Sequence, residues 1–146
     1  MSKNHFLLAF LCSFCFTLNA SADYIDGQRA YASGDYEAAI LEWTQVAQDG
    51  NARAQYNLGW MHANGRGIAQ DFQEAIKWYT KAAEQGNVNA QYNLGNLYLR
   101  GQGASQNDNL AFSWFIKAAE QGDAPAQYNL GRMYLLGKGG DKNFLE

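Results

Sequence analysis

Few residues in this 146-residue sequence are suited to covalent or acid–base chemistry. Beyond the first 22 residues the chain has no cysteine, one histidine and three serines (Ser33, Ser105 and Ser113). A hydrolase would use the histidine as a general base to activate a serine hydroxyl. However, His62 aligns with Tyr98 and Tyr134 further along the chain, so we expect it to be a packing residue. We therefore predict no catalytic residue and no enzymatic activity, with a secreted hydrolase as the weaker alternative.

Metal, redox and phosphate chemistry are equally poorly supported. One histidine and scattered carboxylates lack the spacing of metal ligands, so neither a metal site nor a cofactor is expected. Cys12 and Cys15 form a C-x-x-C pattern, but they lie among Phe and Leu residues in the first segment. The recurring Gly-x-Gly triplets do not follow a predicted strand, so they indicate turns with positive φ and not a dinucleotide-binding loop.

Residues 1–22 have the pattern of a secretory signal peptide. Lys3 provides the positive charge, an apolar stretch runs from Phe6 to Leu18, and Ala20-Ser21-Ala22 has the small residues required for cleavage before Asp23. A retained N-terminal membrane anchor is the alternative, and the short apolar run disfavours it. We expect a periplasmic or secreted mature protein.

Composition narrows the class of partner. The formal net charge is −3 and the sequence pI is about 5.3, so no basic field is present to hold a nucleic acid. No apolar run reaches the length of about 18–20 residues that a membrane-spanning helix needs. An apolar content of 47% indicates a folded chain.

The remaining chain, residues 23–146, is built from a repeat of 36 residues. AQYNLG occurs at Ala54–Gly59, Ala90–Gly95 and Ala126–Gly131, and the segments 52–87 and 88–123 share 17 of 36 residues. Residues 23–51 form a degenerate opening repeat, and residues 124–146 form a truncated one. Such regular recurrence predicts one domain of stacked supersecondary units.

Each unit predicts two helices. Apolar residues recur at helical spacing, for example Ala90, Leu94 and Leu97, and the strand period of two is absent. Asn51, Asn87 and Asp123 are the expected N-caps of the first helices, and Asp71 with Glu74 resembles a capping box. The fold prediction is an all-α solenoid of antiparallel helix pairs.

The truncated repeat predicts an exposed end. Residues 141–146 are too few to cover the apolar face of Ala126, Leu130 and Met133. Because solenoids normally end in a polar capping unit, we expect this face to fray, self-associate or bind a partner.

The hexapeptides, the Gly-x-Gly triplets and the two KAAEQG segments together resemble the Sel1-like repeat family, a branch of the tetratricopeptide superfamily. The resemblance implies packing roles for the repeated Ala and Leu, and close helix approach at Gly59, Gly95 and Gly131. It implies scaffolding between proteins, often in regulation or envelope assembly, and it does not imply a reaction. Secreted members with a cysteine pair in each repeat differ from this chain, so their properties are not transferred.

A concave binding surface is predicted beside the buried stripe of the first helices. Three rows run across the repeats: two are constant, one of tyrosines and one of asparagines (Asn57, Asn93 and Asn129), and the third varies. The candidate partner-binding residues are the tyrosines Tyr56, Tyr92 and Tyr128 together with the variable row Trp60, Asn96 and Arg132. Tyr, Trp and Arg dominate binding hot spots, whereas the constant tyrosines are also explained by consensus packing. The expected function is a non-catalytic scaffold or regulatory adaptor of the cell envelope that binds a protein or peptide. An envelope polysaccharide is the alternative ligand, but Asn96 and Arg132 interrupt the aromatic row.

Overall fold

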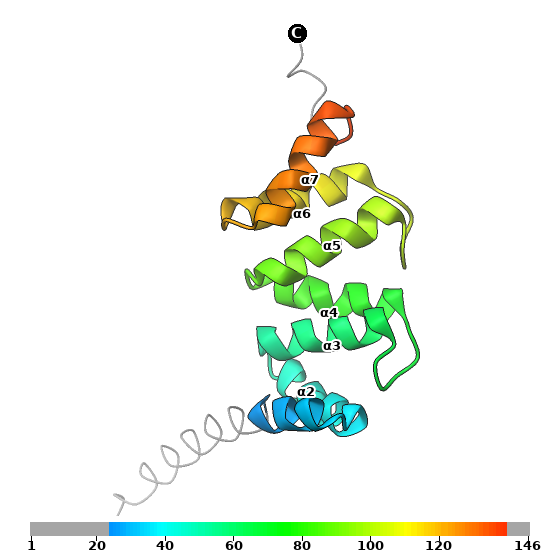
Figure 1. Ribbon diagram of the computed structural model, residues 1–146, viewed down its shortest axis with the longest axis vertical. Coiled ribbons are helices and arrows are strands. Elements are labelled where there is room, and N and C mark those ends of the chain that lie inside the picture. The colour runs from blue at the N-terminus through cyan, green and yellow to red at the C-terminus, as the bar shows by residue number, and fades with distance from the viewer. Residues whose placement is uncertain (1–23, 140–146) are drawn as a thin grey trace, which may run out of the picture.

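The computed structural model describes residues 24–139, which form a stack of helices that follow one another along the long axis (Figure 1). The first helix covers residues 24–33. It is followed by α2 (Tyr36–Gln48), α3 (Ala52–Asn64), α4 (Phe72–Glu84), α5 (Val88–Arg100), α6 (Asp108–Glu120) and α7 (Ala124–Leu135). Each helix packs on the next, so the predicted all-α solenoid is confirmed. None of the helices in this described range has the length and apolar character needed to cross a membrane.

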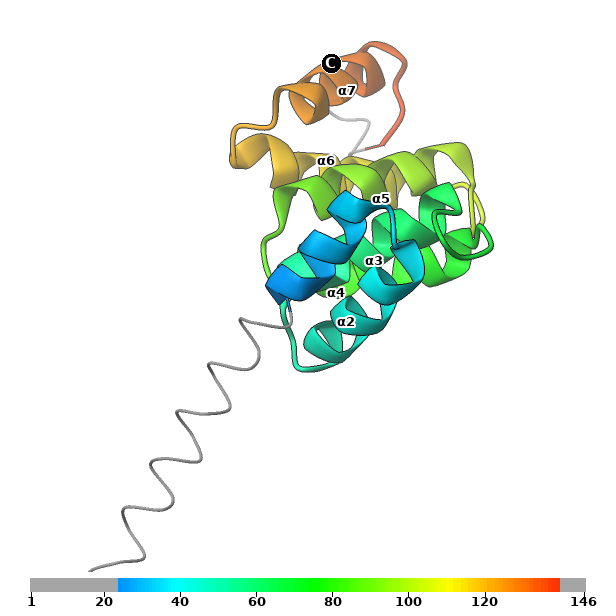
Figure 2. The same ribbon diagram turned by 60° about the horizontal axis from the view of Figure 1, so that its bottom comes forward.

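The predicted signal peptide with Cys12, Cys15 and the predicted Ala22–Asp23 cleavage site lies outside the described residues, and so does the segment 141–146. Within the described range, the first helix and α2 form the opening pair, as the alignment predicted. Figure 2 shows this pair from below and α7 at the opposite end of the stack.

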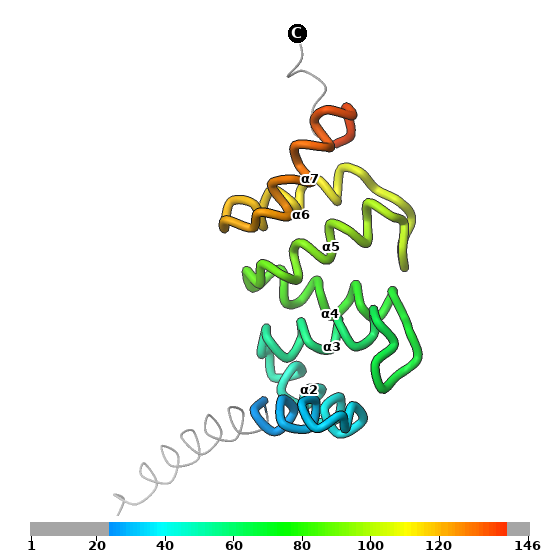
Figure 3. Tube along the Cα trace, in the orientation of Figure 1, coloured from blue at the N-terminus to red at the C-terminus, as the bar shows by residue number. Residues whose placement is uncertain are grey.

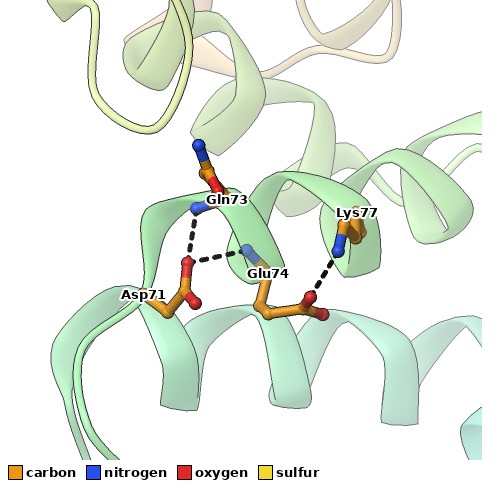
Figure 4. A network of polar contacts seen from close by, with 4 residues as sticks. All are labelled: Asp71, Gln73, Glu74 and Lys77. Carbon is orange, nitrogen blue, oxygen red and sulfur yellow. Dashed lines mark hydrogen bonds and ion pairs between the residues drawn. The ribbon is translucent and has the colours of Figure 1, made fainter.

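Side-chain caps determine where the helices begin. Asn51, Asn87 and Asp123 each accept a backbone N–H with the side-chain oxygen, as predicted. Asp71 does the same for α4, and its Oδ1 accepts the N–H groups of Gln73 at 2.9 Å and Glu74 at 3.0 Å (Figure 4). The N–H of Glu74 is the main reason that the pKa of the Asp71 carboxyl lies below its usual value.

The predicted capping box at Asp71 is only half formed. The Glu74 carboxylate pairs with Lys77 on its own helix (Figure 4). The N–H of Asp71 instead donates to the carbonyl of His62 at 2.9 Å. The reciprocal bond is absent because each group has found another partner, and the Asp71–His62 bond ties the start of α4 to the preceding helix.

Glycine turns connect the helices within each repeat. Both glycines of each Gly-x-Gly triplet have positive φ, which confirms the turn interpretation. Figure 3 shows that the turns after α3 and α5 lie on the same side of the stack. A Cβ on Gly103 would lie 2.5 Å from the backbone carbon of Phe72, so this turn packs directly on the previous repeat.

The core consists of three successive clusters, each formed where a second helix meets the helices on either side. The middle cluster contains buried Tyr79 of α4 and Leu94 of α5, with alanines between them. Small residues allow the helix axes to come close: an ideal Cβ on Gly59 or Gly95 would lie 2.6 or 2.5 Å from the ring of Tyr79 or Phe115. The close approach that was expected at three glycines is confirmed at Gly59 and Gly95 and is wrong for Gly131, where an ideal Cβ meets nothing within 4 Å.

Candidate functional site

A hollow of about 320 Å³ lies between the opening helix pair and α3. Five of its lining side chains are aromatic and two are amides: Tyr24, Tyr31, Trp43, Tyr56 and Trp60, with Gln28 and Asn57. The rings pack against one another, since the Tyr31 ring centre is 5.7 Å from Trp43 and 6.0 Å from Trp60. The indole N–H of Trp43 donates to the carbonyl of Tyr24 at 3.2 Å, which fixes that ring in the wall of the hollow.

A second hollow of about 400 Å³ continues along α3, α4 and α5. Its walls include aromatic rings, amide side chains and one guanidinium: Tyr56, Trp60, Phe72, Tyr79, Tyr92, Asn64, Asn93, Asn96, Gln102 and Arg100. Tyr56 and Trp60 line both hollows, so the two are adjacent. We call their combined surface the aromatic groove.

Charge is sparse in the aromatic groove. No aspartate or glutamate lines either hollow, and Arg100 at the end of α5 is a cationic lining residue of the second one. The amides offer both N–H donors and carbonyl acceptors. Aromatic faces combined with neutral amides fit an extended chain with polar backbone groups better than a highly charged ligand.

Four of the six predicted binding residues meet in this groove. Tyr56, Trp60, Tyr92 and Asn96 all line the second hollow, on the first helices of two successive repeats. The Asn96 Nδ2 donates to the carbonyl of Tyr92 at 3.2 Å, which holds the amide against its own helix. The 36-residue register therefore brings these side chains together.

Tyr128 and Arg132 do not line either hollow. They lie on α7, where the guanidinium carbon of Arg132 is 5.9 Å from the centre of the Tyr128 ring. Both residues are exposed. Each continues its row in the sequence. However, the groove wall beside α3 also contains rings of α4, the second helix of the same repeat, and no such helix follows α7 among residues 24–139.

Burial affects the tyrosines on the floor of the groove. Burial raises the pKa of the Tyr56 phenol, and a hydrogen bond with the Asn93 side chain opposes this change. Burial also raises the pKa of Tyr79. Both phenols therefore stay neutral hydrogen-bonding groups at physiological pH.

Several groove residues were not identified from the sequence. Tyr24, Tyr31 and Trp43 belong to the opening repeat, which lacks the AQYNLG motif that revealed the rows. Phe72 and Arg100 are at helix ends, outside those rows. The available signal for the first three was their aromatic character close to a recognisable repeat.

The serine and histidine side chains that could take part in catalysis are not arranged with one another. The hydroxyls of Ser33 and Ser113 donate to the carbonyls of Ala30 and Leu110 in their own helices, both at 2.9 Å. The Nδ1 atom of His62 is buried and has no hydrogen-bond partner in the described part of the chain. That part also contains no group of three His, Cys, Asp or Glu residues placed to hold a metal ion.

The open end of the solenoid differs from the prediction. Ala126 and Met133 are 0% and 2% exposed because they pack on α6, and Leu130 is half-buried in the same cluster. The face expected to be uncovered is therefore covered. The exposed residues of α7 are on its other side, and they include Tyr128, Gly131 and Leu135.

The sequence pattern of the Sel1 repeat matches residues 52–87, 88–123 and 124–146. Two similar solved structures are the Sel1 repeat protein from Oxalobacter formigenes (TM-score 0.78) and a protective antigen present in uropathogenic Escherichia coli strains, which displays an SLR fold (TM-score 0.76). Each is 36% identical to this chain, over 85% and 84% of its length respectively. The chain spans only 53% and 27% of these two proteins.

A third structure, cysteine-rich protein B of Helicobacter pylori, shares the fold with a TM-score of 0.66 and 19% identity, over 81% of this chain and 93% of the other. A comparison with curated proteins finds no match. The three repeat matches cover more than half of the sequence and agree with the helix pairs described above. The chain belongs to the Sel1 repeat family, whose members usually mediate protein interactions.

Proposed function

We propose that this protein is a non-catalytic binding module that holds an extended peptide segment of a partner protein in the aromatic groove. The single observation that carries the proposal is that two adjacent hollows share Tyr56 and Trp60 in their walls. Together they give an elongated site that runs from the opening helix pair to α5. An elongated site suits an extended chain better than a compact metabolite.

The lining chemistry supports a peptide ligand. Trp60 and Tyr92 offer flat rings on which apolar side chains can pack, and such residues are enriched in binding hot spots. Asn93 and Asn96 offer amide groups for the peptide backbone. Arg100 can form a bidentate pair with a carboxylate of the partner.

This proposal changes the predicted residue set. Arg100 replaces Arg132 among the candidate partner-binding residues, because Arg100 lines the hollow and Arg132 does not. Tyr128 leaves the set for the same reason. Tyr31 and Trp43 join it as the aromatic end of the groove.

The proposed location is the cell envelope, after export and removal of residues 1–22. The support is the basic, apolar and small-residue pattern of that segment. In that compartment the partner would be an envelope protein, for which this chain acts as a scaffold or regulatory adaptor.

Site-specific photo-cross-linking in intact cells tests the groove. Benzoylphenylalanine in place of Trp60 should cross-link to a peptide segment of one protein, to be identified by mass spectrometry. The matched control is the same probe in place of Leu41, which is 72% exposed on α2 and lies outside the groove. Equal cross-linking from both positions, or none from Trp60, would refute the proposal.

A polysaccharide strand is the second candidate ligand. The five aromatic residues of the first hollow favour it, because sugar rings stack on such surfaces. The aromatic lining gives way to Asn93, Asn96 and Arg100 further along, which favours a peptide. Titration with envelope glycans separates the two: binding that is lost in Trp60→Ala, without any protein cross-link, would establish the glycan.

A further inference from the structure

Arg100 is the last residue of α5 and lies at the α5 end of the aromatic groove. Its side chain is exposed and lines the second hollow together with Asn96 and Gln102. Among residues 24–139, no other cationic side chain and no carboxylate lines either hollow. The groove therefore contains one positive charge that its own walls do not neutralise.

Most other cations of residues 24–139 have a partner within the chain. They form ion pairs or stack on aromatic rings: Arg29 with Asp26, Lys77 with Glu74, Lys138 with Asp108, Arg66 on Tyr36, Lys81 on Trp78, Lys117 on Trp114 and Arg132 on Tyr128. Within the same residues, Arg100 makes neither kind of contact. The N–H donors of its guanidinium are therefore open to a ligand.

The fold does not require a cation at this position. A basic residue in the last turn of a helix interacts favourably with the helix dipole, which is the structural explanation for Arg100. However, the residues 36 positions earlier and later are Asn64 at the end of α3 and Leu136 after α7. Gly65 and Gly101 end α3 and α5 with the same left-handed geometry, so this helix end forms without an arginine. A role in binding accounts for the difference.

Two amides beside Arg100 are held in place with their oxygens unused. The Nδ2 of Asn64 donates to the carbonyl of Trp60 at 2.8 Å, and the Nδ2 of Asn96 donates to the carbonyl of Tyr92 at 3.2 Å. Within the described part of the chain, neither amide oxygen accepts a hydrogen bond. Both can therefore accept a backbone N–H of a bound segment, next to the guanidinium that binds its charged group.

We propose that the segment bound in the aromatic groove carries one acidic side chain, an aspartate or a glutamate, whose carboxylate pairs with the Arg100 guanidinium. This inference rests on the proposed function, because it identifies the chemistry of the segment that the groove holds. A guanidinium binds a carboxylate through two parallel N–H···O bonds, which are stronger than neutral hydrogen bonds. Arg100 is thus the residue that gives the groove its charge specificity.

Helix geometry gives the position of the acidic residue within the segment. Tyr92, Asn96 and Arg100 follow one another at intervals of four residues, so they lie on one face of α5. Tyr92 and Arg100 are therefore separated by about 12 Å along the helix axis. An extended chain covers this distance in about four residues. A segment that follows this face places an apolar side chain on Tyr92 and the carboxylate about four residues away.

The charge of the whole protein limits how acidic the segment can be. The formal net charge of the chain is −3, which disfavours the approach of a run of like charges. Arg100 offers a single site of neutralisation in the groove. The ligand is therefore a mainly uncharged segment with one carboxylate, and not an acidic tail.

Selection from a displayed library of short random peptides tests this inference on the full chain. The peptides are joined to the display protein at their C-terminus, so only a side chain can supply the carboxylate. The wild type should enrich peptides with one acidic residue about four positions from an aromatic or apolar residue. Arg100→Gln should not enrich them. Arg53→Gln is the matched control and should behave like the wild type, since Arg53 is also exposed and lies outside both hollows.

Fluorescence anisotropy with a selected peptide measures the contact itself. Replacing the acidic residue of the peptide by its amide, or changing Arg100→Gln, should each weaken binding about fivefold or more. The two changes together should weaken it no further than either alone, because both remove the same ion pair. Arg100→Lys should restore only part of the affinity, because lysine lacks the forked geometry. The thermal melt of Arg100→Gln should match that of the wild type, because the side chain is exposed.

The outcomes separate this inference from the proposed function. Enriched peptides without an acidic residue, whose binding is lost in Trp60→Ala and kept in Arg100→Gln, overturn the inference and leave the groove intact. Peptides that bind equally to the wild type and to both variants bind elsewhere and contradict both proposals. Failure to enrich any peptide, equal weakening by Arg53→Gln, or a synthetic peptide that binds only through a free C-terminal carboxylate would each overturn the inference, and the cross-link from position 60 would still decide the groove.

Discussion

Helices α5 and α7 carry the same hexapeptide, AQYNLG, and have different surroundings. In α5, Gln91 and Leu94 are 4% and 0% exposed, and Gly95 is buried. In α7, Gln127 and Gly131 are exposed, and Leu130 is only half-buried. The difference comes from α6, which covers α5 on the side where α7 has no covering helix among the described residues.

The repeat motif specifies two different interfaces, one on each side of the first helix. One side of each first helix packs on the preceding repeat, and this side is buried in both α5 and α7, as Ala90 and Ala126 show. The other side is buried only when a second helix follows. The motif thus encodes two interfaces, and α7 forms only one of them, so changes at equivalent positions should have unequal effects.

The largest inequality is expected at the repeated leucine. Leu94→Ala should lower the free energy of unfolding by about 2–5 kcal/mol, because the side chain is fully buried and its removal leaves a cavity. Leu130→Ala should lower it by roughly half as much, because that side chain is already partly exposed. Urea unfolding followed by circular dichroism measures both. Equal losses would contradict the proposed difference between the interfaces.

At the repeated glycine, the same substitution should change stability in opposite directions. Gly95→Ala should destabilise the fold by about 1–3 kcal/mol, because the new Cβ would lie 2.5 Å from the Phe115 ring. Gly131→Ala should stabilise it by up to about 1 kcal/mol, because alanine favours helix and the space is open. Thermal melts of the two variants give the signs, and destabilisation by Gly131→Ala would show that the face is occupied.

The repeated glutamine should give a smaller difference. Gln91→Ala removes two hydrogen bonds made by an amide that is only 4% exposed, at a cost of about 1–2 kcal/mol. Gln127→Ala removes a single bond at an exposed position and should cost under about 0.5 kcal/mol. The double variant Gln91→Ala with Gln121→Ala is the control, since it should lose little more than Gln91→Ala alone.

Much of the fold could be predicted because the determining interactions are local. The N-caps at Asn51 and Asn87 and the positive φ of the turn glycines depend on residues adjacent in sequence. The 36-residue period then fixed how the units stack. The capping box at Asp71 was half wrong because Lys77, one turn beyond Glu74, took its carboxylate.

The candidate site was less predictable because a hollow needs walls from several helices. Extending the rows to Tyr128 and Arg132 assumed that every repeat is followed by a covering helix. Tyr31 and Trp43 escaped detection because their repeat has diverged from the motif. Periodicity predicts which side of a helix is apolar, but only the neighbouring helix determines whether that side becomes core or surface.

The smallest effect at neutral pH is expected from the ring that covers Gly59. α4 places Tyr79 there and α6 places Phe115 at the equivalent position, so a phenyl ring is sufficient to fill the space. Tyr79→Phe should therefore change the free energy of unfolding by less than about 1 kcal/mol at neutral pH, the contribution of one hydroxyl hydrogen bond. A larger loss would mean that the hydroxyl, and not the ring, is what the covering helix must supply.

At alkaline pH the stabilities of the wild type and of Tyr79→Phe should diverge. Burial raises the pKa of Tyr79 in the fold, whereas the unfolded phenol loses its proton near pH 10. Above that pH the folded state binds more protons than the unfolded state, so the stability of the wild type falls as pH rises. Tyr79→Phe lacks this group, so its free energy of unfolding should rise relative to that of the wild type by about 1.4 kcal/mol for each pH unit above roughly pH 10. Denaturant titrations at several pH values measure the difference in the free energy of unfolding between the two proteins. Titration of the groups that both proteins share contributes equally to both values and largely cancels. A constant difference would place the Tyr79 phenol in water and would contradict the close packing of the Tyr79 ring on Gly59 in the interface between α3 and α4.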